Sequence, residues 1–134
     1  MSSPTQRTKK FLQDLGWTVA VVERWNPFAN VRQDLFGFVD LLAINGEETM
    51  GVQATASGVA NRLEKSKAQP HFQKWLNSGN RFIVIGWTLK GARGKRKTYK
   101  ARVVEVYRDG EERTWRDEEG ARQTQTSETG EVRS

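Results

Sequence analysis

The chain has 134 residues, which is enough for one domain with a hydrophobic core and too few for two comfortable ones. The absence of cysteine excludes disulfides, a thiolate nucleophile and cysteine-based zinc sites, and the single histidine, His71, excludes histidine-rich metal sites and argues against a Ser-His-Asp triad. The formal net charge is +6, and residues 1–107 hold 17 basic and 8 acidic residues, so the expected globular part favours a polyanionic partner.

The sequence also indicates where the protein works. No run of about eighteen apolar residues is present, which argues against a membrane span. The first ten residues are polar and basic and lack the apolar segment of a secretory signal. We therefore predict a cytoplasmic protein, in a cell or in a phage-infected host.

The first predicted element is a helix that begins at Pro4. Ser3 is the expected N-cap and Gln6 closes a capping box, while Gly16 is a natural C-terminal stop. The segment 17–25 is rich in β-branched and aromatic residues and predicts a strand. Asn26-Pro27 should break that strand, and we expect a loop to about Gly37.

Residues 39–44 and 49–55 predict an antiparallel hairpin around Asn45-Gly46. If Ile44 faces Thr49, position 40 faces position 53; a two-residue loop would shift the pairing by two, but it would leave positions 40, 51, 53 and 55 on one face. The carboxylate of Asp40 then lies on an otherwise apolar sheet beside Gln53. Burial of a carboxylate is costly unless it is paired, hydrogen-bonded or bound to metal, so this face is a candidate site.

Further elements follow along the chain: a helix over about 58–68, a short helix after Pro70, a buried strand over 81–88 and a last strand over 101–107. The long helical connection between the third and fourth predicted strands is the crossover that a parallel strand pair requires. We predict an α/β fold with a mixed four- to five-stranded sheet flanked by helices, forming one domain over 1–108. The charged tail over 109–134 is predicted to be largely disordered.

The order of these elements, Asp40 at the start of a hairpin and Gln53-x-Thr55 on the next strand resemble the PD-(D/E)XK nuclease superfamily, in particular small Holliday junction resolvase-like nucleases of phages and prokaryotes. The resemblance covers roughly residues 4–88. It implies a restriction-endonuclease-like core and one or two Mg²⁺ or Mn²⁺ ions bound by an Asp such as Asp40. The Glu and Lys of the family motif would fall at Gln53 and Thr55, and a further Glu near Gln6.

The chain departs from that motif. Gln53 offers a neutral oxygen and Thr55 cannot replace a Lys. We therefore expect Lys65 or Lys67 on the following helix to supply the positive charge, and Glu23 or Asp34 to supply a second acid. With only one certain carboxylate, Asp40, the ion should bind weakly, because hard divalent cations favour charged oxygen ligands.

Each of these residues also has an ordinary structural interpretation. Asp40 could meet a backbone N–H or an Arg, and Gln53 could simply support Asp40 by a hydrogen bond. Glu23 could pair with Arg24 or Arg32. Asp34 could cap a turn, Gln6 could only cap its helix, and Lys65 and Lys67 could be a solvated helix face.

The segment 90–102 holds seven basic residues and no acid, and its glycines predict a flexible loop that follows a phosphate backbone. Trp25 is a candidate for stacking on a base. The predicted nucleic-acid contacts are Arg62, Lys90, Arg93, Lys95, Arg96, Lys97 and Lys100.

These features predict a metal-dependent DNA endonuclease that hydrolyses phosphodiester bonds in duplex DNA or in branched and junction DNA. A catalytically silent DNA-binding module on the same fold is the first alternative. A protein-interaction factor with a basic face is the second. The sequence leaves open whether the protein acts as a homodimer.

Overall fold

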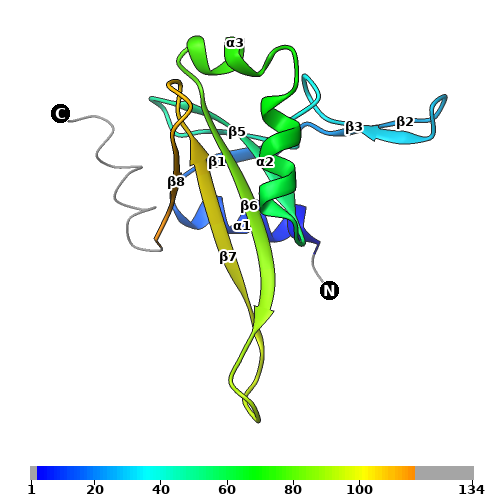
Figure 1. Ribbon diagram of the computed structural model, residues 1–134. Helices are drawn as coiled ribbons and strands as arrows, with labels where there is room; N and C mark the ends of the chain where they lie inside the picture. The colour runs from blue at the N-terminus through cyan, green and yellow to red at the C-terminus, as the bar shows by residue number, and fades with distance from the viewer. Residues whose placement is uncertain (1–2, 117–134) are drawn as a thin grey trace.

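The computed structural model describes residues 3–116, which fold around one mixed six-stranded sheet with three helices (Figure 1). The strand order is β1-β4-β5-β6-β7-β8, and β2 and β3 form a separate two-stranded ribbon. The elements in chain order are α1 (Pro4–Asp14), β1 (Thr18–Val21), β2 (Arg24–Asn26), β3 (Val31–Gln33), β4 (Leu41–Ile44), β5 (Thr49–Thr55), α2 (Val59–Lys67), α3 (Phe72–Asn77), β6 (Arg81–Lys90), β7 (Thr98–Val106) and β8 (Glu112–Thr114).

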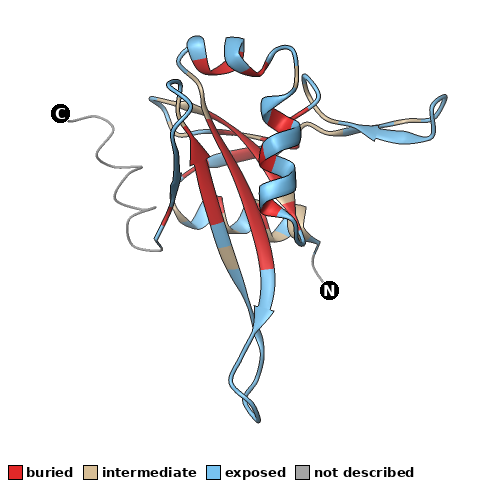
Figure 2. Cartoon of the chain, viewed as in Figure 1, coloured by how far each residue is buried: buried red, intermediate tan, exposed pale blue. Residues whose placement is uncertain are grey.

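Helices cover both faces of the sheet. Alternate residues of β6 belong to two core clusters on opposite faces of the sheet. Ile83 packs in the cluster that includes Leu12 of α1, whereas Phe82 packs with Leu63 of α2 and Trp75 of α3. The prediction that the apolar run of β6 is buried on both faces is confirmed (Figure 2). The capping box of α1 is also confirmed, with Ser3 as the N-cap.

β5 and β6 are the one parallel pair among the described strands, and α2 and α3 form the crossover between them. This confirms the α/β class and the mixed sheet. The predicted number of four or five strands is too low, because β8, which was not expected, pairs with β7 at one edge of the sheet. The sheet thus continues past the expected boundary at residue 108, while the tail predicted to be disordered lies, from residue 117 on, outside the described residues.

The segment predicted as one strand over 17–25 is divided in two. β1 ends at Val21 because the next two amides turn to the Asp40 carbonyl: Val22 N donates to it at 2.8 Å and Glu23 N at 3.1 Å. The loop expected after Asn26 is instead the turn and second strand of the β2–β3 ribbon. The Asn26 Oδ1 accepts from the amides of Phe28 (3.0 Å) and Ala29 (3.2 Å), so the Asn-Pro step closes a hairpin rather than ending the strand pattern.

Two β-hairpins extend from the body of the molecule, the β2–β3 ribbon and the outer part of β6–β7 (Figure 1). Both are exposed over most of their length (Figure 2). Among residues 3–116, no helix has both the length and the apolar character needed to cross a membrane.

Candidate functional site: a cluster of three carboxylates

The β4–β5 register places Asp40 across from Gln53. Leu41 pairs with Val52 and Ile44 with Thr49, so the loop between the strands has four residues. Asn45 holds that loop, because its Oδ1 accepts from the amides of Glu47 (2.9 Å) and Glu48 (2.8 Å). The prediction that Asp40 and Gln53 share one face is confirmed by a hydrogen bond between their side chains.

Asp40 is nearly buried, with 6% of its surface exposed. Its Oδ2 accepts from the backbone amide of Ala54 at 3.0 Å, and its Oδ1 accepts from the Gln53 Nε2 at 3.1 Å. Neither donor carries a charge. None of the ion pairs within the described part of the chain includes Asp40.

The Gln53 amide has a defined orientation. Its Nε2 lies 3.1 Å from the Asp34 Oδ2, 3.1 Å from the Asp40 Oδ1 and 3.0 Å from the Phe38 carbonyl oxygen, while its Oε1 accepts from the Arg62 Nη1 at 3.1 Å. The reversed amide would place an oxygen against three acceptors and two N–H donors against a guanidinium. The Gln53 oxygen predicted as a metal ligand therefore faces Arg62 and not the acids.

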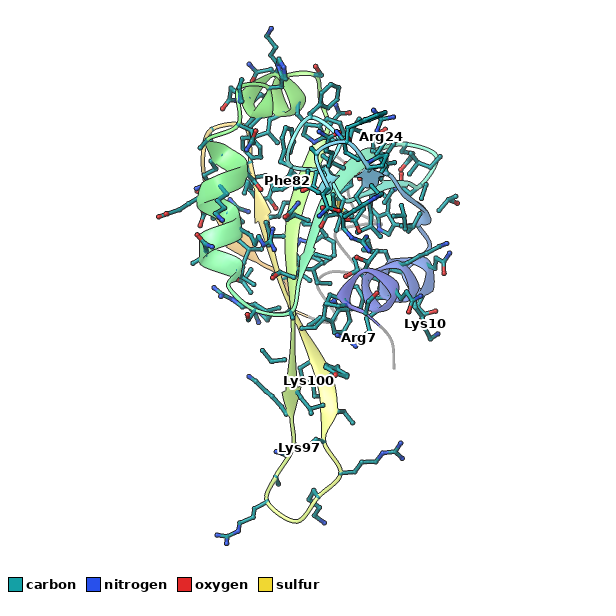
Figure 3. All side chains as sticks on the ribbon, turned by 90° about the vertical axis from the view of Figure 1, so that its right-hand side faces the viewer. Arg7, Lys10, Arg24, Phe82, Lys97 and Lys100 are labelled. Atoms are coloured by element: carbon teal, nitrogen blue, oxygen red, sulfur yellow. The ribbon has the colours of Figure 1, made fainter. Side chains whose placement is uncertain are left out.

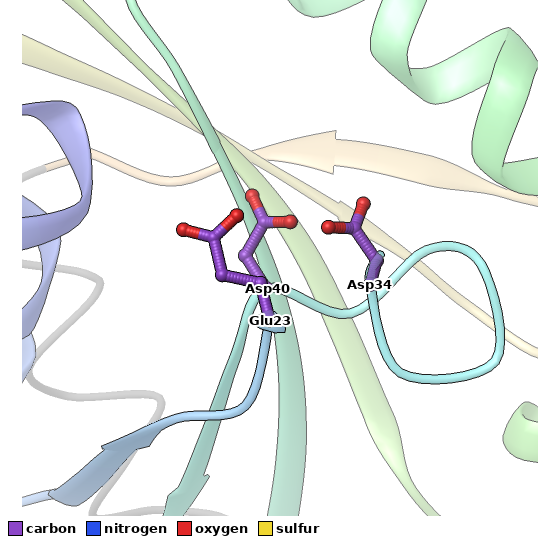
Figure 4. A group of neighbouring side chains, drawn as sticks. All are labelled: Glu23, Asp34 and Asp40. Carbon is purple, nitrogen blue, oxygen red and sulfur yellow. The ribbon is translucent and has the colours of Figure 1, made fainter. Parts of the chain in front are cut away.

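Both candidates for the second acid lie at the site. Glu23 is in the link between β1 and β2, and Asp34 directly follows β3. One carboxylate oxygen from each of Glu23, Asp34 and Asp40 lies within 4.8 Å of the other two (Figure 4). Oxygens in such a group are the ligands that Mg²⁺ and Mn²⁺ favour, so the donor set fits the predicted ion.

The electrostatics of the cluster are unfavourable for three negative charges. Burial and, after it, the neighbouring Asp34 and Glu23 together raise the pKa of Asp40 from 3.8 to about 8, against the lowering effect of the Ala54 amide. Without a cation, the Asp40 carboxyl is therefore largely protonated at neutral pH. A divalent cation bound between the three acids would displace the proton of Asp40 and balance the negative charge of the cluster.

The cluster opens into a cleft of about 680 Å³ between α1, the base of the β2–β3 ribbon and the start of α2. Of the predicted residues, Thr55, Arg62 and Lys65 line it together with the three acids. The approach of α2 depends on Gly86 of β6, where a Cβ atom would lie 2.4 Å from the Val59 Cγ2. This close packing brings Arg62 and Lys65 to the cleft.

Two residues that line the cleft, Thr5 and Arg32, were not predicted from the sequence as site residues. The Glu23 Oε1 accepts from the Thr5 Oγ1 at 3.5 Å and from the Arg32 Nη1 at 3.4 Å. The sequence predicts Arg32 only as an ion-pair partner of Glu23, and that pair is present. The contact of Thr5 with Glu23 could not be predicted, because the two residues are far apart in sequence.

Three other predicted residues, Lys67, Gln6 and Thr55, form structural contacts instead of binding the acids. Lys67 forms an ion pair with Glu112 of β8, so it does not reach the cleft. Gln6 acts in the capping box of α1. Thr55 lines the cleft, but its hydroxyl bonds to the Ser57 backbone, accepting from the amide at 3.2 Å and donating to the carbonyl, and thereby shapes the turn before α2.

The predicted basic contacts over 90–100 lie on the projecting β6–β7 hairpin. Figure 3 shows Lys97 and Lys100 along this hairpin, away from the body of the sheet. None of these residues lines the acidic cleft. The acidic cleft and the basic hairpin are therefore two separate regions of the protein surface.

No protein-family model matches the chain, and no curated protein or solved structure matches it either.

Proposed function

We propose that the protein is a metal-dependent DNA endonuclease on a restriction-endonuclease-like core. The observation that carries this proposal is the group of Glu23, Asp34 and Asp40, whose oxygens lie within 4.8 Å of one another in an open cleft. The resemblance of the element order to PD-(D/E)XK nucleases supports it. The basic character of residues 1–107 adds a reason for a polyanionic substrate.

The residues of the cleft have distinct parts in this proposal. A bound Mg²⁺ or Mn²⁺ would supply an activated water and stabilise charge on the scissile phosphate. Asp40, Asp34 and Glu23 would hold the ion, and the Gln53 amide would fix one oxygen of each of the two Asp carboxylates. Lys65 and Arg62 at the rim would attract and orient the phosphate.

The test is cleavage of supercoiled plasmid and of a four-way DNA junction with Mg²⁺ or Mn²⁺. Wild-type protein should cut, and Asp40→Asn, which keeps the shape and removes the ligand charge, should fall to background with an unchanged circular dichroism spectrum. Glu47→Gln is a matched control, because Glu47 is an exposed acid in the β4–β5 loop. Cleavage by wild-type protein in excess EDTA, or equal cleavage by Asp40→Asn, would contradict the proposal.

The β6–β7 hairpin is the proposed contact with the DNA backbone. Its basic residues are exposed and extend beyond the body of the sheet (Figure 3). Replacing Lys95, Arg96 and Lys97 with Ala should weaken binding to all DNA sequences and reduce the slope of log Kd against log salt by about 3. Unchanged affinity and slope would remove the hairpin from the interface.

The matched control for this triple variant removes three exposed charges elsewhere, at Lys10, Lys74 and Arg108. Its salt slope should stay close to that of the wild type. An equal change in both variants would mean that net charge, and not the hairpin, governs binding.

A silent DNA-binding module is the second candidate, and the Gln53 amide favours it. That amide satisfies an oxygen of both Asp34 and Asp40 without any metal. Hairpin-dependent binding without cleavage of any substrate, together with no effect of Mg²⁺ on stability, would support this alternative over the nuclease.

A further inference from the structure

The β2–β3 ribbon is directly joined to the acid cluster. Arg24 pairs with Gln33 as the innermost pair of the ribbon, so the next residues in register are Glu23 and Asp34. Two of the three clustered carboxylates, Glu23 and Asp34, thus lie at the base of the ribbon, one on each strand's continuation. A partner bound to the ribbon therefore lies next to Glu23 and Asp34.

One face of the ribbon continues the face of the site. Directly paired residues of antiparallel strands share a face, and Trp25 pairs with Arg32. Alternation along the strands places Glu23 and Asp34 on that face as well. The diagonal ion pair between Arg32 and Glu23 agrees with this arrangement.

The ribbon exposes aromatic side chains to an unusual extent. Phe28, at the turn, is 99% exposed, Trp25 is 55% exposed and Val31 is 47% exposed. The ribbon is only three residue pairs long, and these side chains belong to neither of the two core clusters. An aromatic ring held almost wholly in water offers apolar surface whose burial by a partner is favourable.

The charge of the ribbon indicates the class of partner. Residues 24–33 contain Arg24 and Arg32 and no acid, so the outer part of the ribbon carries positive charge, while the acids Glu23 and Asp34 lie at its base. Aromatic rings interleaved with basic residues are suited to stacking on bases while the cations meet phosphates. A second strongly basic hairpin, β6–β7, extends from the same molecule (Figure 1).

We propose that the β2–β3 ribbon binds exposed bases at a discontinuity of DNA, such as a fork or junction, with Phe28 stacking on an unpaired or unstacked base and Trp25 covering a neighbouring one. This inference rests on the proposed function, because it names the substrate class that the acidic cleft would cut. The ribbon places the discontinuity beside Glu23 and Asp34. Continuous duplex, whose bases are stacked internally, offers no such surface.

The experiment measures binding without cleavage, by fluorescence anisotropy in EDTA, to a forked DNA and to a continuous duplex of equal length. Phe28→Ala should weaken binding to the fork at least about fivefold and change duplex binding less than about twofold, as expected for loss of one base–aromatic stack. Trp25→Ala should act in the same direction. A 2-aminopurine base at the fork should lose fluorescence with wild-type protein and keep it with Phe28→Ala.

Ile44→Ala is the matched control, because Ile44 is an exposed apolar residue (48%) outside the ribbon, and it should leave both affinities unchanged. Equal fork binding by wild-type protein and Phe28→Ala would overturn the inference. So would a wild-type dimer in light scattering that Phe28→Ala converts to monomer, because the ring would then cover a second copy of the chain.

The two proposals fail separately. Metal-dependent cleavage without any effect of Phe28→Ala on fork preference would overturn the ribbon inference alone. Phe28-dependent fork binding without cleavage under any metal would overturn the nuclease and leave the ribbon as a DNA-binding element.

Discussion

Two buried carboxylates on the same sheet, Glu105 and Asp40, have opposite kinds of partners. Glu105 is 2% exposed and accepts from the Arg81 Nε and Nη2, both at 2.8 Å, and from the Trp115 Nε1 at 2.9 Å. Asp40 accepts only from an amide side chain and a backbone N–H, next to two further acids. The charge of Glu105 is balanced inside the protein, whereas the charge of Asp40 is not.

The pKa values of the neighbouring groups follow from this difference. Burial lowers the pKa of Arg81, but Glu105 and Glu48 raise it well above its ordinary value, so the guanidinium stays charged. Burial and acidic neighbours raise the pKa of Asp40 to about 8. A closed ion pair is a structural feature, and an unbalanced acid cluster in a cleft is typical of a site that receives a cation.

The largest expected effect is at the balanced site. Glu105→Gln leaves the buried Arg81 with one fewer charged partner and should lower the free energy of unfolding by about 3–5 kcal/mol. Urea denaturation at pH 7 in EDTA measures this. Asp40→Asn in the same assay should cause a smaller loss, because it removes an unbalanced acid and gives up only one of two accepted hydrogen bonds; a loss as large as that of Glu105→Gln would erase the distinction.

The pH dependence of stability should separate the same two residues. The folded protein keeps a proton on Asp40 up to about pH 8, whereas the unfolded chain releases it near 3.8, so raising the pH through this window favours unfolding. We expect the metal-free protein to lose stability on the order of 3 kcal/mol between pH 5 and pH 8. Urea denaturation across that range should show the slope in wild-type protein and in Glu105→Gln, and no such slope in Asp40→Asn.

A divalent cation provides the complementary measurement. Because a ligand must be deprotonated to bind it, Mg²⁺ should raise the melting temperature more at pH 8 than at pH 6. Asp40→Asn should remove this response. An equal Mg²⁺ effect in both proteins would show that the ion binds elsewhere.

Gln53→Glu makes the acid cluster still less balanced. The substitution removes the donor to Asp34 and Asp40 and adds a carboxylate, so it should lower the metal-free stability at pH 8 by about 1–3 kcal/mol. Mg²⁺ should recover that loss and bind more tightly than to wild-type protein. Gln53→Met, which removes the amide without adding charge, separates the lost hydrogen bonds from the added repulsion; tighter Mg²⁺ binding by Gln53→Met would contradict the charge argument.

The acid cluster shows how far sequence reasoning reaches. The hairpin turn and the alternation of β4 and β5 were enough to place Asp40 opposite Gln53, because strand register is a local property. The choice between Glu23 and Asp34 as second acid was not accessible, because it depends on the β2–β3 ribbon that brings both of them to Asp40. The direction of the Gln53 amide depends on Arg62 and Phe38, which no local pattern connects to it.

The balanced site was missed entirely. Glu105 followed the alternation of its strand and gave no sign of burial, and its partner Arg81 lies 24 residues earlier. Residues beyond 108 appeared too polar to belong to the sheet. Tertiary pairing overrides local composition there, because β8 needs only three residues to pair with β7 before Trp115 reaches the core.

Trp115→Phe gives the smallest expected effect and tests this last part of the balanced site. The Phe ring keeps most of the apolar contact of a side chain that is 7% exposed, but it removes the Nε1 donor to Glu105. Because Arg81 still holds both oxygens of Glu105, the loss should be about 1 kcal/mol in urea denaturation. Trp115→Ala should cost more, because β8 then loses its anchor in the core. No effect of either substitution would mean that the sheet ends at β7, and that Glu105 depends on Arg81 alone.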